Sequence, residues 1–395
     1  MSHSQLPPLR LIGAKTLREG RLTNEAISVC DGTLTNDHFH EVNLAGYWVL
    51  PGIVDLHGDG FERHMQPRKG VHFDKYVGLR ATDTELAGNG ITTAVLAQCW
   101  SWLGGRRGPK YAVDLLSAWE KYKAASLVDI RFQIRYETHM VDTVEDLLRA
   151  IHAFKIEYVV FNNHISDASN AHAVDPVGFT AFAEEAGRTI EEHTNVIEQT
   201  MANAYRVDES LCVLSEALAN LDVLLGSHDD ETPAMRRYFS QMGATISEFP
   251  TSLDAAEQAR QLGNPILMGA PNVMRGGSQS GNIAAQDLIE AGLCDAMVSD
   301  YYYPAMLGAV WALVDRGVVS FQQAWAMVSS KPAEILGLSD RGQIEVGKRA
   351  DLVVLNPETR QIEATISNGR IAMLSGAASM GFANIRGSAS GMAAE

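Results

Sequence analysis

Apolar runs and amphipathic stretches alternate along the central part of the chain. From about residue 50 to about residue 335, each apolar run of strand length is followed by a stretch with helical periodicity. The eight apolar runs are residues 49–56, 92–97, 130–136, 158–162, 223–226, 244–247, 265–269 and 296–299. Eight β-then-α units in roughly 280 residues predict an α/β protein in which residues 51–340 form a (β/α)₈ barrel. No G-x-G-x-x-G motif opens a helix after the first strand, which weakens the alternative of an open dinucleotide-binding sheet.

Both ends of the chain contain short strand candidates separated by turns. The N-terminal candidates are residues 9–12, 26–30 and 46–50, and the C-terminal ones are residues 350–355 and 362–367. We expect residues 1–50 and 341–375 to form one small β-sandwich domain built from both termini. Residues 376–395 are rich in Ala, Gly and Ser, and we expect a flexible tail there.

The composition limits the classes of partner. The chain has 48 acidic and 32 basic residues and a formal net charge of −16, which argues against nucleic acid or an anionic membrane as the main partner. The four cysteines form no C-x-x-C pair, and we find neither a signal peptide nor an apolar run long enough to span a membrane. We therefore expect a cytoplasmic enzyme that acts on a small molecule; a homo-oligomer stays open.

Carboxylates and imidazoles stand where five of the candidate strands end. Asp55, His57 and Asp59 are spaced i, i+2, i+4, so a strand directs their side chains to one side. An isolated H-x-D triplet is usually incidental, but four later strand ends carry the same residue types: Glu137, His164, His228 and Asp300. Because carboxyl ends of barrel strands meet at one mouth, these side chains form a candidate ligand set for zinc, manganese, iron or a related divalent ion.

This order of residues resembles the amidohydrolase superfamily, as does the segment at residues 342–355, which is similar to the small β domain of that superfamily. The resemblance implies a metal site of two ions, most readily zinc, made of His57, Asp59, Glu137, His164, His228 and Asp300. It also implies that Glu137 bridges the ions, which would activate a shared water to hydroxide, and that Asp300 is the catalytic residue that takes the proton.

Residues 227–307 resemble, more closely, the branch of the superfamily that cleaves a ribosyl triphosphate in phosphonate catabolism. The matching phrases are SHDD at 227–230, EFPT at 248–251, MGAPN at 268–272, RGGS at 275–278 and SDYY at 299–302. The segment after His164 departs from the pattern of this branch, and Gln279 stands where a histidine is usual. Both departures concern the substrate more than the metal.

A polyanionic substrate requires cations in an otherwise acidic protein. We expect Arg275 with the backbone N–H groups of Gly276 and Gly277 to bind phosphate, together with Arg63 and Arg68 from the loop after the first strand. Arg106, Arg107 and Lys110 could serve the same purpose or lie in a solvated surface turn.

We therefore expect hydrolysis of the triphosphate of a ribosyl phosphonate, or of a related phosphorylated sugar, to the 5-phosphate and pyrophosphate. The first alternative keeps the metal site but cleaves a C–N or C–O bond, as deaminases, N-deacetylases and lactonases do. An apolar pocket without the arginines would favour that alternative. A non-enzymatic binding protein is a third class, and the competent residue at every expected ligand position argues against it.

Overall fold

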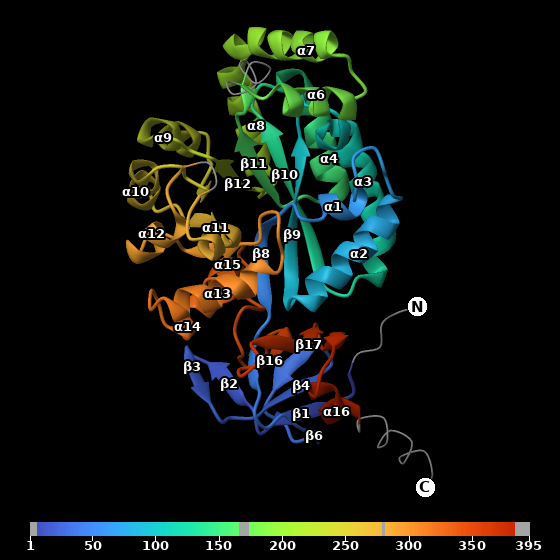
Figure 1. The fold of residues 1–395 in the computed structure, drawn as a ribbon, viewed down its shortest axis with the longest axis vertical. Coiled ribbons are helices and arrows are strands. Elements are labelled where there is room, and N and C mark those ends of the chain that lie inside the picture. The colour runs from blue at the N-terminus through green and yellow to red at the C-terminus, as the bar shows by residue number, and fades with distance from the viewer. Residues whose placement is uncertain (1–5, 166–173, 279–280, 384–395) are drawn as a thin grey trace.

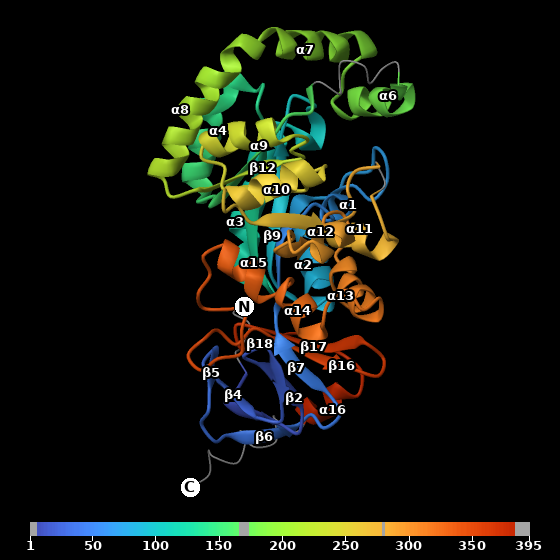
Figure 2. The same ribbon diagram turned by 90° about the vertical axis from the view of Figure 1, so that its left-hand side faces the viewer.

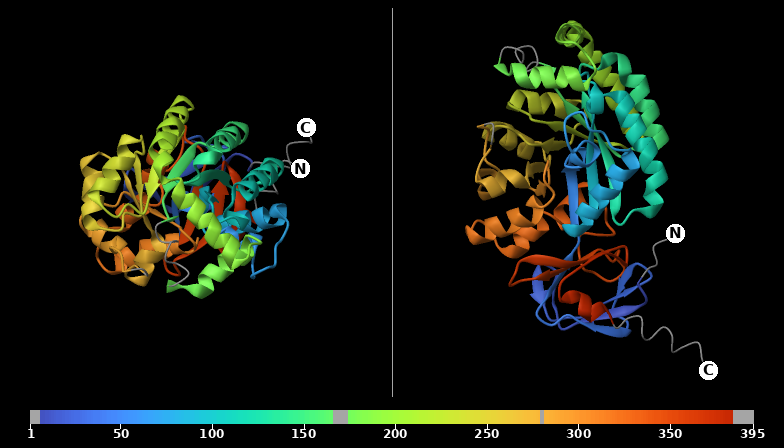
Figure 3. Two further views of the ribbon diagram at one scale, coloured as in Figure 1. Left: turned by 90° about the horizontal axis from the view of Figure 1, so that it is seen from above. Right: turned by 45° about the vertical axis from the view of Figure 1, so that its right-hand side comes forward.

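The computed structural model describes residues 6–165, 174–278 and 281–383. Eight parallel strands form its central sheet in the order β15-β14-β13-β12-β11-β10-β9-β8. Their bounds are β8 Ile53–Gly58, β9 Ile91–Trp100, β10 Asp129–Glu137, β11 Tyr158–Asn162, β12 Leu224–His228, β13 Ile246–Glu248, β14 Ile266–Gly269 and β15 Ala296–Val298. A parallel bridge between Gly58 and Asp300 joins the first strand to the last, so the sheet closes into the predicted barrel (Figure 3, left).

Helices surround this barrel (Figure 1). Those that follow the early strands are α1 Glu62–Met65, α2 Lys75–Gly88, α3 Pro109–Tyr122, α4 Val144–Phe154 and α8 Val207–Asn220. Those that follow the later strands are α9 Pro233–Gln241, α10 Leu253–Gln261, α11 Ala270–Arg275, α12 Ala285–Glu290, α13 Ala305–Asp315, α14 Phe321–Ala326 and α15 Ser330–Ile335. None of the helices in the described part of the chain is long and apolar enough to cross a membrane.

The two ends of the chain pair as expected. A six-stranded sheet has the order β18-β17-β16-β7-β2-β3, and a four-stranded sheet has the order β5-β4-β1-β6. Strand β7 runs antiparallel to β16, which joins residues about 300 positions apart. The bounds are β1 Leu9–Ile12, β2 Lys15–Arg18, β3 Arg21–Thr23, β4 Ile27–Cys30, β5 Thr33–Thr35, β6 His40–Asn43, β7 Trp48–Pro51, β16 Leu352–Asn356, β17 Gln361–Ser367 and β18 Arg370–Leu374. The exact division of the chain into domains stays a prediction.

The expected first barrel strand is two strands. The run at 49–56 breaks at Gly52, with β7 on one side in the small sheet and β8 on the other side in the barrel. A Cβ atom at Gly52 would lie 2.2 Å from the Thr92 side chain, so only glycine lets the chain pass β9 this closely. The barrel strands therefore start beside the small sheets, and their carboxyl ends lie at the far end of the molecule.

The expected flexible tail is in part ordered. Residues Ala378–Ala383 form α16, and the buried Ala378 and Phe382 pack into the apolar core of the small sheets with Val42 and Leu44. Two buried apolar side chains explain why this Ala- and Gly-rich stretch docks. Residues 384–395 lie outside the described residues.

A helical excursion follows β11 that the apolar pattern did not predict. It contains α6 (Pro176–Glu185) and α7 (Ile190–Ala202) and lies beyond the carboxyl ends of the strands (Figure 2). Thr189 and Glu192 form a capping box at the start of α7. A small apolar cluster of Trp102, Ile165, Phe179 and Ile197 attaches the excursion to the loop after β9.

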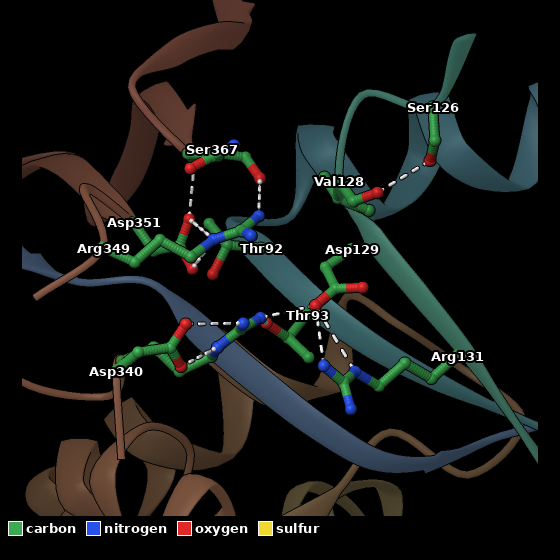
Figure 4. A network of polar contacts seen from close by, with 12 residues as sticks. Thr92, Thr93, Ser126, Val128, Asp129, Arg131, Asp340, Arg349, Asp351 and Ser367 are labelled. Atoms are coloured by element: carbon green, nitrogen blue, oxygen red, sulfur yellow. Dashed lines mark hydrogen bonds and ion pairs between the residues drawn. The ribbon is translucent and has the colours of Figure 1, made fainter. Parts of the chain in front are cut away.

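A polar network joins the segment after α15 to the amino ends of the barrel strands (Figure 4). The buried Arg341 donates to Asp129 at 2.6 Å and to Thr93 at 2.9 Å, and its other nitrogens bind Asp340. Nearby, Arg349 binds Asp351, whose carboxylate accepts a hydrogen bond from the backbone of Asn368. The network thus ties the C-terminal segment to the barrel.

We expect Arg341→Met to lower the free energy of unfolding by about 2 kcal/mol, because it leaves Asp129 and Thr93 without their buried donor. Urea unfolding checks this value. Arg131→Met is the matched control, since Arg131 also binds Asp129 but is more exposed, and a loss below about 1 kcal/mol is expected there. Equal losses in the two variants would contradict the importance of the buried arginine.

Candidate metal centre and pocket

One carboxylate holds two of the predicted imidazoles. The fully buried Glu248, at the end of β13, accepts hydrogen bonds on Oε2 from Nδ1 of His57 at 2.8 Å and from Nδ1 of His228 at 3.1 Å. Its Oε1 accepts from Tyr158 and Gln133, each at 2.6 Å. Burial alone would raise the pKa of Glu248, but the two imidazoles hold it well below its usual value, so the carboxylate stays ionised.

These bonds orient both imidazoles. A carboxylate only accepts, so Nδ1 of each ring carries a proton, and a ring that is neutral has its lone pair on Nε2. The two rings are stacked, with centroids 5.2 Å apart. His57 Nε2 is buried and has no hydrogen-bond partner within the described part of the chain. Nε2 of a fixed, neutral imidazole is a nitrogen that a divalent ion can bind. His57, His228 and Glu248 are the one group of three or more possible ligand side chains that lie close together among the described residues, and the other predicted ligands are not part of it: Asp59, Glu137, His164 and Asp300.

Glu137 and His164 form a second pair. Glu137 Oε1 lies 2.6 Å from His164 Nδ1, and Oε2 accepts from the His164 backbone at 3.1 Å. Burial disfavours the charged imidazole, but the neighbouring Asp229 and Glu137 outweigh this effect and raise the pKa of His164 to about 9. Glu137 lies at the strand end where the sequence predicted it, with both oxygens directed to His164.

Asp59 lies beside Arg135, which was not among the expected site residues. The guanidinium of Arg135, on β10, is 3.4 Å from Asp59 Oδ2 through Nη1 and 3.1 Å from His228 Nε2 through Nη2. Arg135 therefore lies between two of the predicted metal ligands.

Asp300 lies at the seam where the barrel closes. Its backbone N–H binds the carbonyl of His57 at 2.9 Å, and its carbonyl accepts from the N–H of Asp59 at 2.8 Å. Burial and then the neighbouring Asp59 carboxylate raise the pKa of Asp300 to about 6. A carboxylate with such a pKa can accept and release a proton near neutral pH.

Asp55, two residues before the H-x-D triplet of His57 and Asp59, has a structural role. Its carboxylate accepts from the backbone and hydroxyl of Ser299 at 2.9 and 2.5 Å, which fastens β8 to β15. Gly58 lies against the same contact, because a Cβ there would be 2.7 Å from the Ser299 hydroxyl. The segment thus contributes His57 and Asp59 to the mouth while Asp55 closes the barrel.

The pocket over the centre has a volume of about 240 Å³. It brings together residues expected to serve the metal and residues expected to bind substrate: His228 and Asp300 with Arg275 and Gly277. Asp229, which was not among the expected site residues, also lines the pocket. The imidazoles of His228 and His164 overcome the effect of burial and lower the pKa of Asp229 to about 2.

Asp229 has a left-handed backbone, with φ at 58°, held by a buried ion pair below it. Arg236 binds Asp230 at 3.0 Å and the Ser227 hydroxyl at 2.7 Å, and all three side chains are buried. This pair fixes the turn that presents His228 and Asp229 to the pocket.

Two of the expected phosphate-binding arginines, Arg63 and Arg68, are not among the residues that line this pocket. Arg63 binds Glu85 and donates to the carbonyl of Tyr301 at 2.8 Å, so its guanidinium already has partners. Arg68 lines a different hollow with Lys69 and Arg106. Gly276 is a left-handed residue that ends α11 and is not among the residues that line the pocket. Gln279 and residues 166–170, the positions where the sequence departs from the related branch, lie outside the described residues.

The barrel fold and the carboxylates and imidazoles at its strand ends point to the class of metal-dependent hydrolases. Comparison with known protein families agrees with this class. The model of the amidohydrolase family matches residues 77–373. The chain belongs to the amidohydrolase family.

Individual relatives are consistent with this assignment. The chain is 32% identical over 327 residues to the α-D-ribose 1-methylphosphonate 5-triphosphate diphosphatase of Escherichia coli (strain K12), covering 80% of this chain and 85% of the relative. It is 22% identical to the dihydroorotase of Halobacterium salinarum, over 87% and 84% of the two chains. The same fold occurs in a putative prolidase from Bifidobacterium longum (TM-score 0.64, 16% identity, 97% and 100% covered) and in a D-hydantoinase from a Bacillus species (TM-score 0.61, 12% identity, 93% and 95% covered).

Proposed function

We propose that this amidohydrolase is a metal-dependent diphosphatase that cleaves α-D-ribose 1-methylphosphonate 5-triphosphate, or a related phosphorylated sugar, to the 5-phosphate and pyrophosphate. The observation that carries the proposal is the pocket in which Arg275 and Gly277 lie beside His228 and Asp300. An anion-binding arginine next to a hydrolytic centre suits a triphosphate. The identity to the Escherichia coli diphosphatase supports the same substrate class.

The centre would hold a divalent ion through His57, Asp59, Glu137, His164, His228 and Asp300, with zinc expected first and manganese or iron as alternatives. When bound, the ion acts as a Lewis acid and lowers the pKa of water. Glu248 orients the His57 and His228 rings through their Nδ1 atoms, and Nε2 of His57 is the one of the two that has no partner among the described residues. Asp300 takes the proton of the attacking water, and Arg275 binds the phosphate chain. We expect the enzyme to act in the cytoplasm.

Hydrolysis of a C–N or C–O bond is the alternative reaction of the same centre. Such substrates carry no triphosphate, and only those with a carboxylate would pair with an arginine in the pocket. The lining by Arg275, Asn272 and Ser278 favours an anionic, hydrogen-bonding substrate.

Arg275→Ala tests the proposal. We expect the Michaelis constant for a ribosyl triphosphate to rise at least about tenfold while the metal content stays at the wild-type value, because a charge-assisted bidentate contact is lost. Steady-state kinetics and metal analysis measure both quantities. Arg149→Ala, on the exposed face of α4, is the control and should change neither. An unchanged Michaelis constant in Arg275→Ala would remove the phosphate-binding role.

A further inference from the structure

Arg135 projects into the interior of the barrel from β10. Side chains along a strand alternate, so Gln133, Arg135 and Glu137 share one side. Gln133 reaches Glu248 and Glu137 reaches His164, which places both neighbours of Arg135 on this side at the candidate centre. The Arg135 side chain between them is 13% exposed.

The Arg135 guanidinium contacts two atoms that a metal ion would otherwise bind, one on His228 and one on Asp59. Nη2 lies 3.1 Å from Nε2 of His228, whose Nδ1 is already bound to Glu248. Because Nε2 therefore has only a lone pair, Arg135 is the donor in this contact. Nη1 lies 3.4 Å from a carboxylate oxygen of Asp59. His57 differs from His228, since its Nε2 has no partner in the described part of the chain.

A guanidinium keeps its charge at any pH at which the protein is folded. In this position it neutralises Asp59 and repels a divalent ion that approaches Asp59 and His228 together. The Asp59 carboxylate lies 3.4 Å from the guanidinium and favours this charge. The cation is therefore a stable part of the centre.

We propose that Arg135 takes the place of the second cation, so that the centre holds one divalent ion per chain, with His57 Nε2 as the imidazole nitrogen open to it. This inference rests on the proposed function and specifies it. Arg135 would supply a fixed positive charge and N–H donors for an oxygen of the phosphate chain. In a centre with two ions, the second ion would bind this oxygen instead.

Metal stoichiometry tests the inference without an activity assay. The metal-free full chain is titrated with Zn²⁺, desalted and measured by mass spectrometry of zinc against protein; a Mn²⁺-loaded sample is examined by EPR. We expect one ion per wild-type chain and the EPR spectrum of an isolated Mn²⁺. Arg135→Met, which exposes His228 Nε2 and Asp59, should bind two ions and give the spectrum of a coupled pair. Arg135→Lys keeps a charge at this place and should stay at one.

The matched control is Arg131→Met, two residues earlier on the same strand, where the arginine binds Asp129 and Glu157; it should stay at one ion. Two ions in the wild type, or one in a folded Arg135→Met, would overturn the role of Arg135 and leave the proposed function standing. If Arg135→Met does not fold, the wild-type count and Arg135→Lys decide the matter. A wild-type chain that binds no ion would contradict the proposed function itself.

Discussion

Asp300→Asn is expected to lower the turnover number by about 10²- to 10⁴-fold, because the amide cannot take the proton of the attacking water. Asp300 is the carboxylate at the barrel seam that faces the pocket, and its backbone joins His57 to Asp59. The substitution keeps the shape and the backbone bonds. Steady-state assays at saturating metal concentration measure the turnover number. Asp295→Asn, at the other end of β15, is the matched control and should retain near-wild-type turnover, whereas retention by Asp300→Asn would disprove its role.

The same residue predicts a pH dependence. The pKa of Asp300 is about 6, raised by burial and by Asp59, and the ionised form is the one that accepts a proton. kcat/KM should therefore fall as the pH falls through about 6 or lower, since a bound cation favours the ionised carboxylate. This acidic limb should be absent from the residual activity of Asp300→Asn.

Glu248→Gln should weaken metal binding about 10- to 100-fold and lower turnover with it. The amide has one acceptor oxygen for the two Nδ1 donors, and its NH₂ group opposes a protonated Nδ1. One imidazole would then turn or change tautomer and present Nε2–H to the centre. Tyr158 and Gln133 would compete for the same oxygen. Competition with a chelator of known affinity measures the loss.

Glu363→Gln provides the control for that experiment. Glu363 is also a buried carboxylate with several donors, including Tyr47 at 2.8 Å, but it lies in the small sheets. We expect wild-type metal affinity in this variant. Wild-type affinity in Glu248→Gln as well would show that the carboxylate does not position the imidazoles.

Much of the barrel followed from the sequence because buried strands and their helices differ in length and periodicity. Seven of the eight expected barrel runs overlap a single strand each, and that strand belongs to the barrel. The apolar pattern of the first run did not indicate the break at Gly52. Glycine is required there because the Thr92 side chain, 40 residues away in the sequence, leaves no room for a Cβ atom. The excursion of α6 and α7 was not predicted because α6 has little contrast between its faces, although the capping box at Thr189 was a usable local signal.

For the candidate centre, the sequence could predict only those residues that stand at the ends of strands. The rule that selected Glu137, His164 and His228 applies equally to Glu248, which directly follows an expected strand. Arg135 could not be found in this way because it lies within a strand, and a cation among metal ligands contradicts the expected charge pattern. Arg63 was expected at the substrate, yet its partner Glu85 comes from α2, a contact that only the tertiary structure creates.

We propose above all that the chain is a metal-dependent hydrolase of a phosphoanhydride. Phosphorus NMR tests it with the zinc-loaded full chain, a chelated sample, and separate reactions with α-D-ribose 1-methylphosphonate 5-triphosphate, a nucleoside triphosphate and dihydroorotate, the last also followed by ultraviolet absorbance. We expect pyrophosphate and the 5-phosphate from the ribosyl triphosphate, and neither product after chelation. No pyrophosphate from either triphosphate, together with opening of the dihydroorotate ring, would contradict it.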